Sequence, residues 1–137
     1  ATTLIDVATL TGACVVALGD RYTGAFSNSD ELMSKIVQAS ILAGENIWRL
    51  PMGDEEYDNL NASTVADIAN CGKKCGATAA ARFLGEFVEK KPWVHLDIAG
   101  TSESDEDTEI YSKGGTGAAT MLLYEVVKLM EKPYKSY

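Results

Sequence analysis

The feature that most constrains the fold is an abrupt change of pattern between residues 4 and 19. Apolar residues (Leu4, Ile5 and Val7) predict a short strand over residues 3–8, buried on both faces, which stops at two hydroxyl residues and a glycine. A helix of small residues is then expected over residues 12–18. Such a strand–loop–helix unit exposes loop backbone above a sheet edge, where α/β enzymes place ligand contacts.

The rest of the chain continues the alternation of strands and helices. Strands are expected at residues 24–26, around 48–52 and at 93–99, the last with Val94, Leu96 and Ile98 on one side. Helices are expected at 30–43, 54–60, 77–88 and 117–130, with 61–76 and 100–116 as loops. On the first of these helices, the apolar stripe is expected to consist of Leu32, Ile36, Val37 and Ile41. This order predicts an α/β fold with helices on both faces of a sheet.

Charge and composition exclude several classes of function. With 137 residues and 46% hydrophobic residues, the chain is long enough for one domain with a real core. A net charge of −8 argues against a nucleic-acid partner. The sequence holds no membrane-spanning run, and we expect a cytoplasmic protein.

Because the strand follows Ala1 almost directly, we expect a piece of a longer chain with apolar surface exposed along residues 3–8.

Few residues could carry chemistry alone. The H-x-D pair of His95 and Asp97 lies on one face of its strand and could hold a metal or form an acid–base couple. However, a catalytic zinc needs three protein ligands, so a hydrogen-bonding role is favoured. Cys71 and Cys75 lack a second ligand pair, and the acidic loop at 103–109 does not match a calcium-binding loop.

Five blocks of the sequence, in order, resemble the leucine (cytosol) aminopeptidase family. They are D-V-A-T-L-T-G-A at 6–13, W-R-L-P at 48–51, A-D-I-A-N at 66–70, the helix around 79–84, and W-V-H-L-D-I-A-G at 93–100. Together with Lys113, the turn at 114–117 resembles the late K-G-x-T-G turn of the family.

The resemblance implies the C-terminal part of an aminopeptidase catalytic domain over residues 1–137, a three-layer α/β fold with a mixed sheet flanked by helices, like that of zinc peptidases. It implies a hexamer that removes N-terminal residues such as leucine from peptides. Two divalent cations (zinc, manganese or magnesium) would activate the water. The family's metal ligands and catalytic arginine would lie before Ala1, so we expect no catalytic or metal-binding residue in this chain and no activity from it alone.

By position, the resemblance assigns a substrate-facing wall. Backbone groups of the loop would hold the peptide, and small side chains would leave room for a leucine-sized group. The substrate-binding residues implied are Thr9, Leu10, Gly12, Ala99, Ser102 and Cys71. Two alternatives stay open: a non-catalytic structural relative of the same fold, and an unrelated α/β domain that binds a small molecule.

Overall fold

A mixed four-stranded sheet forms the centre of the computed structural model, which describes residues 1–53, 60–61, 63–70 and 76–131. The strands are β1 (Leu4–Ala8), β2 (Thr23–Ser27), β3 (Ile47–Arg49) and β4 (Trp93–Asp97), in the order β1-β4-β2-β3. β1 pairs with β4 and β2 with β3 in parallel, whereas β2 and β4 are antiparallel. The expected α/β fold with a mixed sheet is confirmed.

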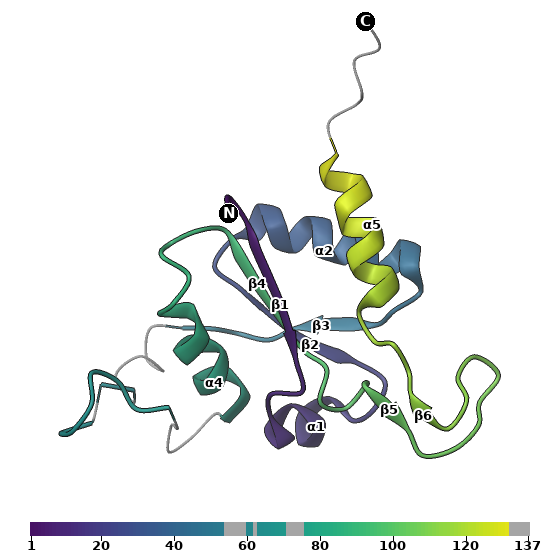
Figure 1. Cartoon of the computed structure of the whole chain (residues 1–137), viewed down its shortest axis with the longest axis horizontal. Coiled ribbons are helices and arrows are strands. Elements are labelled where there is room, and N and C mark those ends of the chain that lie inside the picture. Colours follow the sequence, from purple (N-terminus) through teal and green to yellow (C-terminus); the bar gives the residue numbers. More distant parts are fainter. Residues whose placement is uncertain (54–59, 62, 71–75, 132–137) are drawn as a thin grey trace, which may run out of the picture.

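Helices cover both faces of this sheet (Figure 1). They are α1 (Gly12–Leu18), α2 (Asp30–Ala43), α4 (Gly76–Gly85) and α5 (Thr120–Met130). The predicted bounds of α1 and α2 match, and Gly44 ends α2 in the left-handed conformation expected of a glycine C-cap. The predicted helix at 54–60 falls almost wholly outside the described residues.

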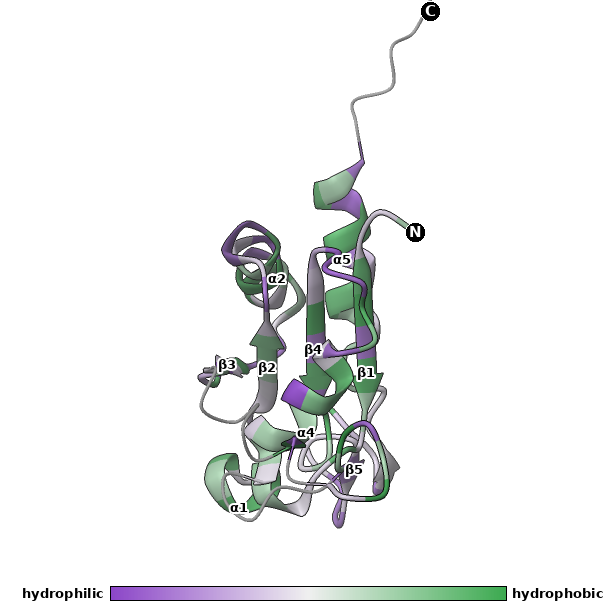
Figure 2. Ribbon diagram, turned by 90° about the vertical axis from the view of Figure 1, so that its left-hand side faces the viewer, coloured by the Kyte–Doolittle hydropathy of each residue, from purple (hydrophilic) through white to green (hydrophobic). Residues whose placement is uncertain are grey.

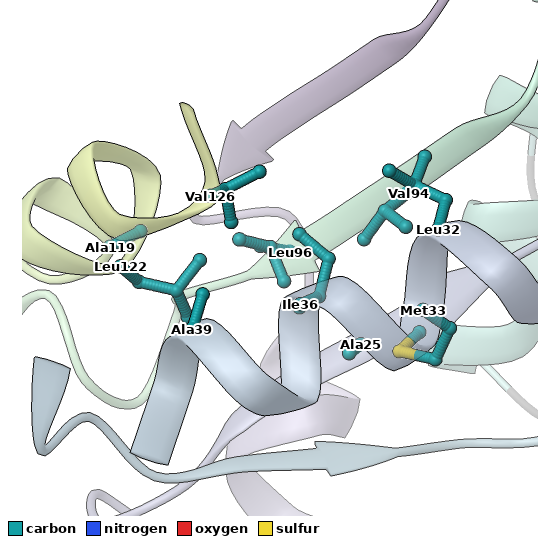
Figure 3. Packing of buried hydrophobic residues seen from close by; sticks show 10 residues of the cluster. All are labelled: Ala25, Leu32, Met33, Ile36, Ala39, Val94, Leu96, Ala119, Leu122 and Val126. Carbon is teal, nitrogen blue, oxygen red and sulfur yellow. The ribbon is translucent and has the colours of Figure 1, made fainter. Parts of the chain in front are cut away.

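The alternation of side chains along β4 separates two cores. Val94 and Leu96 pack with α2 and α5, and Figure 3 shows Ile36, Ala39, Leu122 and Val126 gathered there. Trp93, on the opposite face, packs with Phe26, Cys14 and the alanines of α4. In Figure 2 the hydrophobic colour accordingly predominates on β1, β4 and α5.

Three predictions about these elements need correction. On α2, Val37 and Ile41 were expected in the apolar stripe, but they are exposed and the small residues Ala39 and Ser40 are buried instead. Small side chains let α2 and α5 approach closely, as Figure 3 shows for Ala39 beside Leu122. On α4, the helix ends at Gly85, so Phe87 falls beyond it and is exposed.

The third correction concerns residues 100–116, expected to be loop throughout. Glu103–Ser104 (β5) and Gly114–Gly115 (β6) form a short antiparallel ladder within it.

Every residue of β1 is partly exposed, and this strand lies at one edge of the described sheet. The expectation that residues 3–8 are buried on both faces is therefore wrong, whereas the expected exposure along this strand is confirmed.

No helix in the described part of the chain is long and apolar enough to cross a membrane.

Candidate functional site

The candidate site lies where β1 and β4 end side by side. Ala8 and Asp97, the last residues of the two strands, are partners in the parallel register. Thr9–Thr11 lead from β1 into α1, whose first residue is Gly12. Thr9, Leu10 and Gly12 are exposed, and a Cβ added to Gly12 would meet open space. Backbone of this loop therefore faces solvent at the sheet edge, as the sequence predicts.

A buried carboxylate joins this loop to the segment after β4. Asp97, which is 1% exposed, accepts hydrogen bonds at Oδ1 from the backbone N–H groups of Leu10 (3.1 Å), Thr11 (3.4 Å) and Ala99 (3.2 Å). Its Oδ2 accepts from the Thr11 hydroxyl at 2.7 Å. The hydrogen-bonding role expected of Asp97 is thus confirmed, and it brings Leu10 and Ala99, two of the predicted site residues, to one oxygen atom.

The Thr11 side chain connects Asp97 to the first turn of α1. Its Oγ1 accepts the backbone N–H of Cys14 at 3.0 Å, so Thr11 caps the helix while its hydroxyl proton is directed to Asp97. The sequence analysis did not select Thr11. A threonine immediately before a run of helix-forming residues is the N-cap signal that would have found it.

The turn at 98–102 is fixed by neighbours on both sides. The N–H groups of Thr101 and Ser102 donate to the Ile98 carbonyl, and the Ser102 carbonyl accepts from Thr116 at 3.0 Å. A Cβ on Gly100 would collide with the Gly19 carbonyl oxygen, so the turn packs directly on the end of α1. These contacts place Ser102 in the same turn as Ala99. Cys71, the last predicted site residue, lies outside the described residues.

His95 pairs with Asp6 on the neighbouring strand and not with Asp97. The fully buried imidazole Nδ1 lies 2.6 Å from Asp6 Oδ1, and the ring stacks between Phe26 and Trp93. Trp93 Nε1 donates to the other oxygen of Asp6. The parallel register places Asp6 beside His95, but sequence alone could not reveal that pairing.

Cys14 lies beneath the loop and is 1% exposed. Burial, and secondarily the negative charge of Asp97, raises the pKa of its thiol. A cysteine with a raised pKa stays protonated at neutral pH, so it lacks the thiolate that a nucleophile or metal ligand requires.

The described residues do not fit a pair of divalent cations. Within residues 1–53, 60–61, 63–70 and 76–131, no group of three or more His, Cys, Asp or Glu side chains gathers as a metal site. Both oxygens of Asp97 already accept protein donors, and Nε2 of His95, which has no hydrogen-bond partner among the described residues, is a single nitrogen where two cations need several ligands.

An open groove of about 600 Å³ lies elsewhere, between α2 and β3, where it is lined by Ile41 and Trp48 among others. It shares no lining residue with the loop at 9–12 or the turn at 98–102.

Comparison with known proteins shows the family of this chain. Residues 1–124 match the model of the catalytic domain of the cytosol aminopeptidase family. A probable cytosol aminopeptidase of Alkaliphilus metalliredigens is 51% identical over 133 residues, which are 96% of this chain and 26% of the relative. One from a Picosynechococcus species is 50% identical over 115 residues, 83% of this chain and 23% of that relative.

Solved structures give the same result. A mutant of tomato leucine aminopeptidase superposes with a TM-score of 0.84 at 43% identity, covering 92% of this chain and 24% of that one. The bottromycin maturation enzyme BotP in complex with Mn gives 0.89 at 41% identity, covering 96% and 29%. The chain thus spans about a quarter of the length of the curated relatives it matches, and it belongs to the cytosol aminopeptidase family.

Proposed function

We propose that this chain supplies the substrate-pocket wall of a metal-dependent aminopeptidase that releases N-terminal residues such as leucine from peptides. The observation that carries the proposal is the meeting of the Leu10 and Ala99 backbones at Asp97 Oδ1, beside loop backbone open to solvent. The names of the relatives support the reaction class, since they are aminopeptidases.

The hydrogen bonds within the loop limit which of its backbone groups are available to bind a peptide. The N–H groups of Leu10 and Thr11 are committed to Asp97. Among the described hydrogen bonds outside helices and strands, none engages the carbonyl of Thr9 or Leu10. These carbonyls are therefore the groups we assign to a substrate ammonium or amide N–H. Because they read the peptide backbone, side-chain preference would come from the pocket surface, with Ala99 and Ser102 at the turn and Gly12 leaving open space.

As the resemblance implies, we place the metal ligands of such an enzyme outside this chain; among the described residues, no three or more His, Cys, Asp or Glu side chains gather as a metal site. When bound, a pair of divalent cations activates water and polarises the scissile carbonyl. The chain would then position the substrate and line the pocket, as the C-terminal part of the catalytic domain in a cytoplasmic homo-oligomer, the hexamer that the resemblance implies.

A chimera tests the proposal. This chain replaces the matching 133-residue segment of the Alkaliphilus metalliredigens relative, which supplies the remaining three-quarters of the protein. With manganese added, the chimera should hydrolyse a leucine anilide, whereas the 137-residue chain alone should not.

Two results would contradict the proposal. A folded chimera that binds manganese but has no turnover would favour a non-catalytic relative of the fold. Turnover by the isolated chain, with uptake of two metal ions in calorimetric titration, would mean that the active site has been misplaced.

A further inference from the structure

The exposed loop at 9–12 has little apolar packing to hold it. Thr9 and Gly12 are exposed, and Leu10 keeps 37% of its surface accessible. Ordinary loops of this kind have several accessible conformations, and ordering them costs entropy. The parts of a pocket wall, in contrast, must keep fixed positions relative to one another. The hydrogen bonds of the Asp97 carboxylate are the contacts that supply this constraint.

The carboxylate links segments that are distant in sequence. Its bonds to Leu10 and Thr11 span 87 and 86 residues, while its bond to Ala99 is local. One oxygen thereby sets the spacing between the loop after β1 and the turn after β4. Hydrogen bonds to a charged acceptor are about twice as strong as neutral ones, and burial at 1% exposure strengthens them further.

A neutral replacement of the same shape cannot reproduce this arrangement. Asparagine has one acceptor oxygen, and its NH₂ group would have to face either the three N–H groups at Oδ1 or the Thr11 hydroxyl at Oδ2. The Thr11 hydroxyl oxygen accepts from Cys14 and has a second lone pair, so an NH₂ group facing it would donate to it and leave the Thr11 hydroxyl proton without its acceptor. The substitution Asp97→Asn therefore removes the charge, together with either the N–H bonds at Oδ1 or the acceptor of the Thr11 proton, while leaving the volume of the side chain nearly unchanged.

Asp6 offers a matched comparison on the same sheet. It is also a carboxylate with two engaged oxygens, and it also joins β1 to β4. Its donors, however, are the side chains of Trp93 at the start of β4 and His95 in its middle, away from the loop. Asp6→Asn thus perturbs the same strand pair without touching the segments at 9–12 and 98–102.

We propose that Asp97 is a positioning residue that sets substrate affinity and side-chain selectivity by fixing the loop at 9–12 relative to Ala99 in the pocket wall. It acts through the backbone of Leu10, Thr11 and Ala99 and does not touch the substrate. The inference rests on the proposed function, because the wall it fixes is the wall assigned there.

Kinetics in the chimera provide the first test. For Asp97→Asn we expect KM for a leucine anilide to rise about 10-fold or more, with kcat changed by less than about 3-fold, since a charged hydrogen-bond network is lost but the metal site is untouched. The preference for leucine over alanine anilide, as a ratio of kcat/KM, should fall. Asp6→Asn should leave both KM and this preference unchanged.

Two further measurements keep the test decisive. Thr11→Val removes only the bond to Oδ2 and the helix cap, so its KM should rise less than that of Asp97→Asn. In the 137-residue chain, amide hydrogen exchange followed by NMR should show loss of protection at Leu10, Thr11 and Ala99 in Asp97→Asn, with the amides of β4 retained.

The outcomes separate the two proposals. An inactive, folded and metal-loaded chimera refutes the proposed function, and the exchange experiment then decides the role of Asp97 alone. If the chimera is active but Asp97→Asn and Asp6→Asn change KM and selectivity equally, the positioning role is wrong. It is equally wrong if exchange rises uniformly through β4, because that pattern reports general destabilisation.

Discussion

At the edge where β1 and β4 end, polar contacts connect the loop at 9–12 to the turn at 98–102. On the face covered by α2 and α5, the contacts are apolar: Ile36, Leu96, Leu122 and Val126 are each at most 1% exposed. The first region depends on direction, because hydrogen bonds require aligned donors and acceptors. The second depends on buried area, which is non-directional. We therefore expect the apolar face to determine stability and the polar end to determine geometry.

The most severe test of this contrast is Leu122→Ala on α5. Leu122 is 1% exposed within the cluster shown in Figure 3, so the change leaves a cavity and should lower the free energy of unfolding by about 2–5 kcal/mol. Urea unfolding of the chain measures it. Met121→Ala, at a neighbouring residue that is 54% exposed, is the control and should stay within about 0.5 kcal/mol. Equal losses for the two variants would mean that this face is not a packed core.

The polar end should respond most strongly to added volume at Gly100. An alanine Cβ there would meet the Gly19 carbonyl oxygen, a backbone atom that cannot rotate away, and we expect a loss of about 1–3 kcal/mol in urea unfolding. Gly12→Ala is the matched control, because its Cβ would meet nothing within 4 Å and alanine is the better helix former. A destabilised Gly12→Ala with an unaffected Gly100→Ala would reverse the packing described for this end.

Removal of the α1 cap should have a smaller effect. Thr11→Ala loses the bonds to Cys14 and Asp97, and we expect a decrease of about 1–2 kcal/mol in unfolding free energy. Thr11→Ser keeps the hydroxyl and should recover most of that loss. If serine performs no better than alanine, the hydrogen bonds are not what Thr11 contributes.

The smallest effect is expected at Glu45, a polar residue that contacts α5 on the apolar face. Glu45 accepts the N–H groups of Ala119 and Leu122 and so caps α5 from a distant loop. Because Glu45→Gln retains one acceptor oxygen, it should cost only about 0.5–1 kcal/mol, measured by thermal unfolding. A loss comparable to that of Leu122→Ala would show that polar contacts also dominate this face and would remove the contrast.

Sequence could predict the two regions to different extents. Local signals located α1 and α2 well, since Thr11 and Ser29 precede helical runs and Gly44 ends one. The buried set on α2 follows helical spacing from Leu32 and Ile36 to Ala39 and Ser40, but it was harder to predict because these two small residues are less apolar than the exposed Val37 and Ile41.

The site shows the same limit. A hydrogen-bonding role for Asp97 was predictable from its H-x-D pattern, and the position of the loop from the end of the strand. The pairing of His95 with Asp6 depends on strand register across 89 residues, which no local pattern specifies. The substrate-binding roles of Thr9, Leu10, Gly12, Ala99 and Ser102 stay predictions.

The pairing of β1 with β4 also has a kinetic consequence. β1 is the first strand of the chain and β4 the last of its main sheet, so their register can form only after the intervening segment has closed a long loop. Contacts of large sequence separation are slow to form, because the closure entropy is lost before they contribute. We expect helices α1 and α2 to form from local contacts, whereas the carboxylate and its loop meet only once β1 and β4 are paired. Binding at this end of the sheet therefore requires a chain in which the two strands distant in sequence have already come together.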